Sequence, residues 1–250
     1  MADFDRYGTA RARAVPRTAE IDEGLRAYMI RVYNYMAAGV GITGVVAYLT
    51  YTMAVVETAT GVQLTDFGAF MFTSAFRWVV ILAPLGMVFY LGARIGHMSL
   101  AGAQTAFWIF AGLMGLSLAS IFLVYTQASI SRVFFISAAS FGALSLYGYT
   151  TKKDLTGWGS FLFMGLIGII IAMLVNIFLA SSALDFAISV IGVLIFAGLT
   201  AYDTQRIKEM YFVGDDGTVA GRKAVMGALS LYLDFINLFL MLLRLFGNRQ

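Results

Sequence analysis

Two aspartates lie in apolar segments where charged side chains are rare, and they are the residues of this sequence best placed to do chemistry. Asp203 follows a tyrosine in GLTAYDTQRIK (198–208), and Asp234 lies inside SLYLDFINLFLMLLRLFG (230–247). An ionised aspartate at the centre of a membrane helix costs about 2.5–3.5 kcal/mol on insertion scales. Acidic residues in such positions commonly belong to ion pathways and proton relays.

Two carboxyl groups in contact can share one proton. In a water-poor setting both cannot stay charged at low cost, because burial and like-charge repulsion disfavour the doubly ionised state. A single proton held between the two groups is the favoured state, and the pair then titrates as a unit. With one proton the carboxyls would clamp two helices together, and with none their repulsion would separate the helices and admit water or a cation. The simpler alternative is a purely structural hydrogen bond.

A polar stripe surrounds the second aspartate. Ser230, Asp234, Asn237, Met241 and Arg244 recur at spacings of four, three, four and three, which places them on one helical face. The intervening residues are Leu, Phe and Ile, with one tyrosine at position 232. Because such a helix must turn its stripe towards protein or water, we expect it at the centre of a bundle. On that face, Ser230 and Asn237 are candidates to support the aspartate pair.

The composition is that of a membrane protein. The chain has 250 residues, of which 60% are hydrophobic and 12% charged, with a mean hydropathy of +0.82, whereas soluble domains average about 45–50% apolar and about 25% charged residues. The absence of cysteine excludes disulfides, thiol nucleophiles and sulfur-ligated metals. A single histidine, His97, excludes a multi-histidine metal site. We expect no cofactor, and the net charge of +3 predicts membrane topology rather than nucleic-acid binding.

Seven apolar runs predict an all-α membrane protein with seven transmembrane helices. Each is close to the length of about 20 residues that a spanning helix needs. A polar tail of residues 1–27 precedes a transmembrane domain of residues 28–250. The runs lie at about 29–53, 74–93, 100–124, 133–149, 158–180, 184–203 and 224–246.

The basic residues predict the orientation. With the amino terminus in the cytoplasm, twelve Lys and Arg residues fall on the inner side and two on the outer side, as the positive-inside rule requires. Seven crossings would place the carboxyl terminus outside. A re-entrant last helix would instead return it to the cytoplasm.

Two other motifs have simpler explanations than chemistry. GVGITG (39–44) matches a dinucleotide-binding fingerprint but lies inside the first apolar run, without the strand that this motif needs. Small residues there favour close helix packing. His97 could sense cytoplasmic pH, but a solvated loop histidine is the favoured interpretation.

The segments AYDTQRIK (201–208) and LSLYLDFINLFLMLLRLFG (229–247) resemble the Bax inhibitor-1 family, also called the transmembrane Bax inhibitor motif family. The resemblance covers the whole chain in length and helix number, and the short tail is similar to the bacterial branch. It implies a fold in which two three-helix layers wrap a central carboxyl-terminal helix. It also implies a pH-sensitive calcium leak of the inner membrane, with Asp203 and Asp234 as the hydrogen-bonded pair that senses pH and transiently contacts Ca²⁺, the permeant ion.

Two family features are altered or loosely matched. Some relatives carry a further acid one turn before the second aspartate, where this chain has Ser230. Bacterial relatives can also latch the pair with a basic residue at the inner end of the second helix. Arg94, in LGARIGH, is the candidate for that latch here.

Two functions other than conduction are alternatives for this sequence. Intramembrane aspartyl proteases also place aspartates on their sixth and seventh helices, but they carry Gly-x-Gly-Asp and Pro-Ala-Leu motifs. This chain has LYLDF, and its only prolines are Pro16 and Pro84, so we expect no enzymatic activity. The other alternative is a non-conducting interaction protein that modulates a membrane-bound quality-control protease through the arginine-rich tail.

Overall fold

The computed structural model describes residues 15–58 and 61–249, and it is built almost entirely from long helices. Among the described residues, seven helical segments are long and apolar enough to cross a membrane. This confirms the predicted all-α membrane fold with seven spans. The elements are α2 (Val15–Ala54), β1 (Val55–Thr58), β2 (Gly61–Leu64), α3 (Asp66–Phe72), α4 (Phe76–Arg94), η1 (Ile95–His97), α5 (Leu100–Leu118), α6 (Ile121–Val124), α7 (Gln127–Thr150), α8 (Thr156–Leu179), α9 (Ser182–Glu209) and α10 (Gly217–Phe246).

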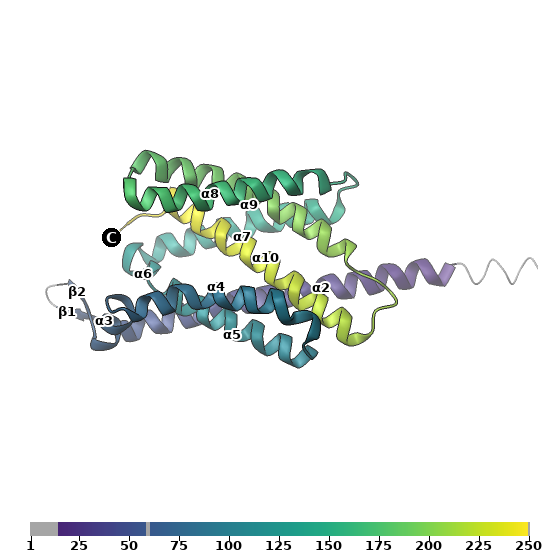
Figure 1. Ribbon diagram of the computed structural model, residues 1–250, viewed down its shortest axis with the longest axis horizontal. Helices are drawn as coiled ribbons and strands as arrows, with labels where there is room; N and C mark the ends of the chain where they lie inside the picture. Colours follow the sequence, from purple (N-terminus) through teal and green to yellow (C-terminus); the bar gives the residue numbers. More distant parts are fainter. Residues whose placement is uncertain (1–14, 59–60, 250) are drawn as a thin grey trace, which may run out of the picture.

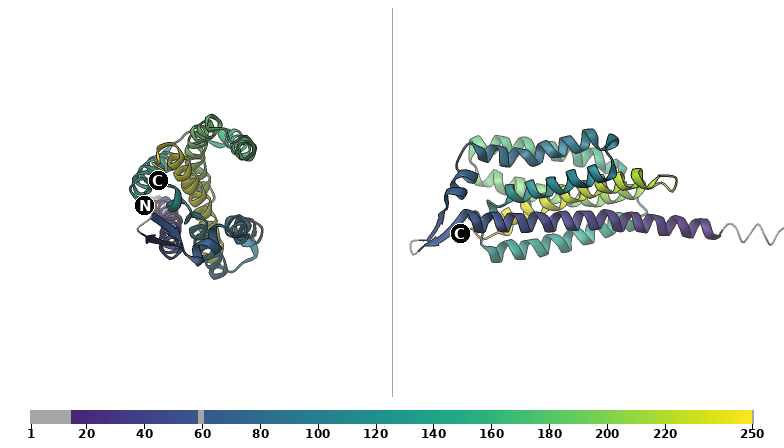
Figure 2. Two further views of the ribbon diagram at one scale, coloured as in Figure 1. Left: turned by 90° about the vertical axis from the view of Figure 1, so that its left-hand side faces the viewer. Right: turned by 90° about the horizontal axis from the view of Figure 1, so that it is seen from below.

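The last helix lies at the centre of the bundle. It runs obliquely between two groups of spanning helices, as Figures 1 and 2 show. In one group α5 packs between α2 and α4, and in the other α9 packs between α7 and α8. Helix α10 packs against α9, α2, α7 and α5. The predicted central place of this helix is therefore confirmed.

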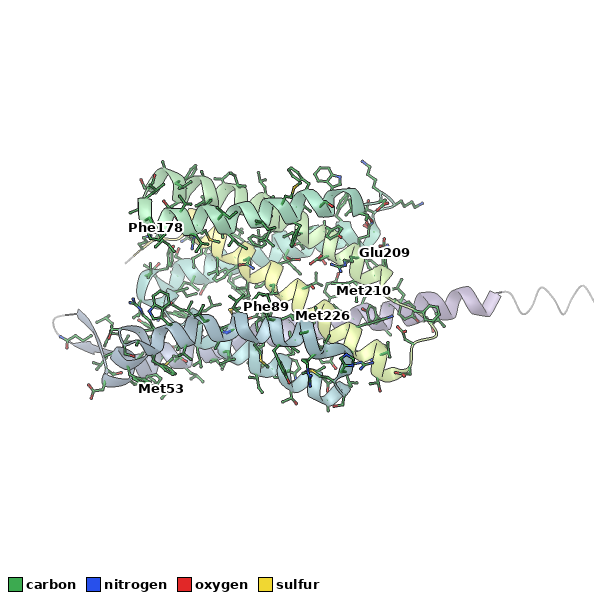
Figure 3. All side chains as sticks on the ribbon, in the orientation of Figure 1. Met53, Phe89, Phe178, Glu209, Met210 and Met226 are labelled. Atoms are coloured by element: carbon green, nitrogen blue, oxygen red, sulfur yellow. The ribbon has the colours of Figure 1, made fainter. Side chains whose placement is uncertain are left out.

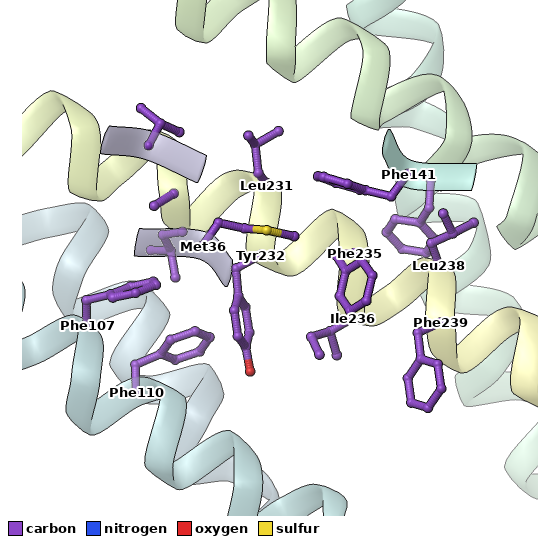
Figure 4. Close-up of a cluster of buried hydrophobic side chains, with 14 of the residues drawn as sticks. Met36, Phe107, Phe110, Phe141, Leu231, Tyr232, Phe235, Ile236, Leu238 and Phe239 are labelled. Carbon is purple, nitrogen blue, oxygen red and sulfur yellow. The ribbon is translucent and has the colours of Figure 1, made fainter. Parts of the chain in front are cut away.

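Aromatic side chains fill the space around α10 (Figure 4). The ring of Tyr232 lies 5.1 Å from Phe110 and 6.2 Å from Phe107, both on α5. Its hydroxyl shares a 2.6 Å hydrogen bond with Thr43 Oγ1 of α2. Edge-to-face contacts of this kind add to the gain from apolar packing, and the hydrogen bond satisfies a buried polar group. Tyr232 thus ties α10 to both α2 and α5.

Small residues bring the helices of each group together. A Cβ at Gly148 of α7 would collide with the backbone carbonyl of Ala201 on α9. At Gly39, within GVGITG, it would lie 2.8 Å from the ring of Phe107. The glycines therefore permit close helix contact, as expected of this motif inside a spanning helix.

The outer surface of the bundle is apolar. Large side chains such as Phe89 on α4 and Phe178 on α8 project away from the bundle, and they are 69% and 88% exposed (Figure 3). In a soluble protein a surface of this extent would be a liability. Around a membrane-spanning bundle it is the surface that contacts lipid.

Two regions differ from or extend beyond the predicted segments. The loop after the first span forms the β1–β2 hairpin and the short helix α3, neither of which is among the predicted elements. Helix α2 begins at Val15, inside the segment predicted as a polar tail. The remainder of that tail, residues 1–14, lies outside the described residues, and so do most of the arginines considered for a protease partner.

Candidate functional site

The two aspartates line the same cavity. It has a volume of about 490 Å³ and lies between α8, α9 and α10. Asp203 is partly buried on α9, and Asp234 is only 5% exposed on α10. Their carboxyl groups are within hydrogen-bonding reach of each other. The structure therefore brings together the pair that the sequence singled out.

The surroundings of Asp234 leave it dependent on its partner. Its Oδ2 atom is fully buried, and no N–H or hydroxyl group of the described residues donates to it. A buried carboxylate oxygen without a donor is costly. A hydrogen bond between two carboxyl groups requires a proton on one of them. The arrangement therefore suits a single proton held between Asp203 and Asp234.

The residues that follow Asp203 fasten α9 to α7. Thr204 Oγ1 lies 2.9 Å from Ser145 Oγ of α7, which in turn lies 2.7 Å from the hydroxyl of Tyr33 on α2. Thr204 Oγ1 also donates to the Thr200 carbonyl at 2.7 Å. This buried chain of hydroxyl groups fixes the rotation of α9 and directs Asp203 towards α10 instead.

The next residues of the AYDTQRIK segment hold the α7–α8 connection. Gln205 accepts a hydrogen bond from the Leu155 amide and donates to the Lys153 carbonyl, both at 2.8 Å. Lys208 Nζ donates to the Tyr149 carbonyl at 2.9 Å. Gln205 and Lys208 therefore anchor α9 to the end of α7 and to the α7–α8 connection. Asp203 takes no part in these hydrogen bonds and can interact with Asp234.

Ser230 and Asn237 line the same cavity as the aspartates. The amide of Asn237 is already engaged, because Nδ2 donates to the Leu233 carbonyl one turn earlier at 2.8 Å. Their placement agrees with the expected polar face of α10. A direct role of either side chain towards the pair stays a prediction.

Arg206, rather than Arg94, is the cationic residue beside the pair. It lies three residues after Asp203 on α9, it lines the cavity, and its charge acts on the Asp203 carboxylate. Arg94 lies exposed at the end of α4 and is absent from the cavity lining. In this arrangement Arg94 does not lie beside the pair, and its role as a latch stays a prediction. Arg206 was not among the predicted site residues, although its i, i+3 spacing from Asp203 was the available signal.

The polar stripe of α10 divides into two parts. Ser230, Asp234 and Asn237 line the cavity, whereas Met241 is buried against Gly192 of α9. Arg244, at the far end, approaches Asp185 at 3.6 Å. Apolar packing therefore separates the cavity from the end of the bundle that carries Arg244.

An acidic residue outside the spanning segments provides a contrast to the pair. Asp154 lies exposed in the α7–α8 connection, where its Oδ1 accepts a hydrogen bond from the Thr156 amide at 2.8 Å. Hydrogen bonds from the side chain and amide of Thr156 hold the pKa of Asp154 below its ordinary value.

Within the described part of the chain, no three His, Cys, Asp or Glu residues are grouped to hold a metal ion.

Comparison with known proteins gives consistent matches along the chain. A family model described as "Inhibitor of apoptosis-promoting Bax1" matches residues 25–250. An uncharacterized protein of Rickettsia prowazekii is 49% identical, over 92% of this chain and 92% of its own. The inner membrane protein YbhL of Escherichia coli strain K12 is 46% identical, over 99% of this chain and 100% of its own. An uncharacterized protein of Caulobacter vibrioides is 45% identical over the full length of both chains.

Proposed function

The chain belongs to the Bax inhibitor-1 family of membrane proteins, and from this premise we propose that it is a pH-sensitive cation leak channel in which Asp203 and Asp234 form the gate. Ca²⁺ is the expected permeant ion. The location of YbhL supports placement in a bacterial inner membrane, and the excess of basic residues supports a cytoplasmic amino terminus. The cavity then lies towards the cytoplasmic side of the bilayer. The proposed role involves no catalysis.

The observation that carries this proposal is that both carboxyl groups line one cavity and interact with each other there. The other titratable side chains that line this cavity are those of Tyr202 and Arg206, both on α9. When one proton is present, the pair holds α9 against α10. When it leaves, two carboxylates repel each other and favour separation of the helices. Flux should therefore rise as the pH rises through the last deprotonation of the pair.

The chemistry of the site suits a permeant ion better than a stored one. Calcium held tightly takes about 6–8 oxygen ligands. Two carboxylates with a few hydroxyl, carbonyl or water oxygens would hold it weakly. Conduction requires an ion to leave as readily as it enters, so a weak site between α9 and α10 is consistent with a leak.

The proposal can be tested with purified protein in liposomes that contain a calcium-sensitive dye. Ca²⁺ entry is measured across a pH series for the wild type, Asp203→Asn and Asp234→Asn. Asp154→Asn is the matched control, because it removes an exposed charge near the same membrane surface but outside the cavity.

We expect the wild type and the control to share one pH profile. Each variant of the pair should lose the pH dependence, because one carboxyl group alone cannot form a doubly charged pair. An unchanged rate and profile in both variants of the pair would exclude this gate.

A further inference from the structure

A second cavity lies between α2 and α7. It has a volume of about 780 Å³, which is within the range of about 300–1,000 Å³ typical of small-molecule sites. Helices α2 and α7 belong to different three-helix groups, so this groove marks the seam between them. It shares no lining residue with the cavity of the aspartates.

The walls of the groove are apolar and reach the outer surface of the bundle. Ile30 of α2 and Leu146 of α7 line it and are 46% and 62% exposed. Met36 and Phe141 line it from the buried side. Because these residues belong to membrane-spanning segments, the surrounding medium is hydrocarbon. An acyl chain is the molecule of matching chemistry that can enter from it.

One end of the groove is cationic. Arg26 lines it there, is exposed, and makes no ion pair or hydrogen bond with any described side chain. Across the groove, Tyr149 lies under Lys208, whose Nζ is 5.6 Å from the ring centre. Two cations thus flank the end of an apolar groove close to the membrane surface. Basic sites of this kind between transmembrane helices bind anionic lipid headgroups.

We propose that this groove binds one anionic phospholipid, with its phosphate at Arg26 and an acyl chain between α2 and α7. The hydroxyl groups of Tyr33 and Ser145 at the floor satisfy each other at 2.7 Å, so the apolar chain leaves no unpaired polar group beneath it. The assignment is independent of ion conduction, because it depends only on the groove and on Arg26.

Two substitutions address the acyl chain and the headgroup separately. Gly142 lines the groove, and a Cβ there meets nothing within 4 Å, so Gly142→Leu has room at its Cβ and adds side-chain volume to the groove. Its control is Gly41→Leu, which also projects into open space but lies outside the groove. Arg26→Gln removes the headgroup cation. Its control is Arg31→Gln, an exposed arginine of the same helix outside the groove.

The measurement is native mass spectrometry of the detergent-solubilised protein titrated with dioleoylphosphatidylglycerol or dioleoylphosphatidylcholine. We expect the wild type and both controls to bind the anionic phosphatidylglycerol more tightly than the zwitterionic phosphatidylcholine. Arg26→Gln should weaken its binding about fivefold, the effect of roughly one interfacial cation, and leave the zwitterionic lipid unchanged. Gly142→Leu should weaken binding of both lipids.

Equal loss in Arg26→Gln and Arg31→Gln would show a general surface-charge effect and overturn the proposal. Equal binding of the two lipids by the wild type would do the same, as would unchanged binding by Gly142→Leu. Gel filtration establishes that each variant is folded. If Gly142→Leu fails that check, the comparison of the two arginine variants decides the outcome.

Discussion

The free energy of unfolding should depend on pH in the range where the Asp203–Asp234 pair titrates. Replacing Asp234 with asparagine should remove that dependence. Under the proposed gate, the folded state of the wild type holds one proton between Asp203 and Asp234, and unfolding removes the contact that holds it. Stability must then fall as the pH rises and that proton leaves the folded protein. Two unit charges about 4 Å apart repel by about 4 kcal/mol at an effective dielectric constant of about 20. The wild type should therefore lose up to about 4 kcal/mol across this transition.

The variant should behave differently because asparagine has almost the same volume and its Nδ2 group donates to the Asp203 carboxylate. That hydrogen bond survives at high pH, where the wild-type pair carries two charges. The assay is unfolding in mixed micelles by increasing mole fractions of dodecyl sulfate at several pH values, with Asp154→Asn as the control. Parallel pH dependences for the wild type and Asp234→Asn would refute the argument that these carboxyls interact.

Two further predictions concern the packing that positions the site. Gly148→Ala should destabilise the fold by about 1–3 kcal/mol in the same unfolding assay, because its Cβ meets the Ala201 carbonyl. The control Gly142→Ala should not destabilise the fold. Equal effects of the two substitutions would contradict the close contact of α7 and α9. Tyr232→Phe should lower the free energy of unfolding by about 0.5–1.5 kcal/mol through loss of the hydrogen bond to Thr43, and a Thr43→Val background should abolish that loss. An additive double variant would show that the two hydroxyls do not interact.

Much of the architecture could be predicted from the sequence because lipid imposes strong rules on it. Each spanning helix needs a long apolar run, and a helix with a single polar face cannot sit in lipid. The spacing of Ser230, Asp234 and Asn237 therefore predicted both the face of α10 and its central position. The hairpin β1–β2 was not predicted, because it lies outside the membrane segments, where apolar length carries no information.

The site was predicted less completely than the fold. The cost of charge in lipid identified Asp203 and Asp234, but their contact depends on how α9 is rotated, and this rotation is fixed by hydrogen bonds from Thr204 and Gln205 to distant segments. Arg206 was counted only as a basic residue near the membrane surface. Its place in the cavity depends on the rotation of α9 (Ser182–Glu209), because residue 206 lies about one turn after Asp203 on that helix.

The shared proton can be observed most directly by infrared spectroscopy of the protonated carboxyl band, in protein with isotope-labelled aspartate, as a function of pH. The account predicts that the band titrates as a property of the pair, so that Asp203→Asn displaces the titration of Asp234 and Asp234→Asn displaces that of Asp203. If each carboxyl group instead titrates at the same pH whether or not the other is present, the two aspartates do not hold a proton jointly, and the proposed gate is contradicted.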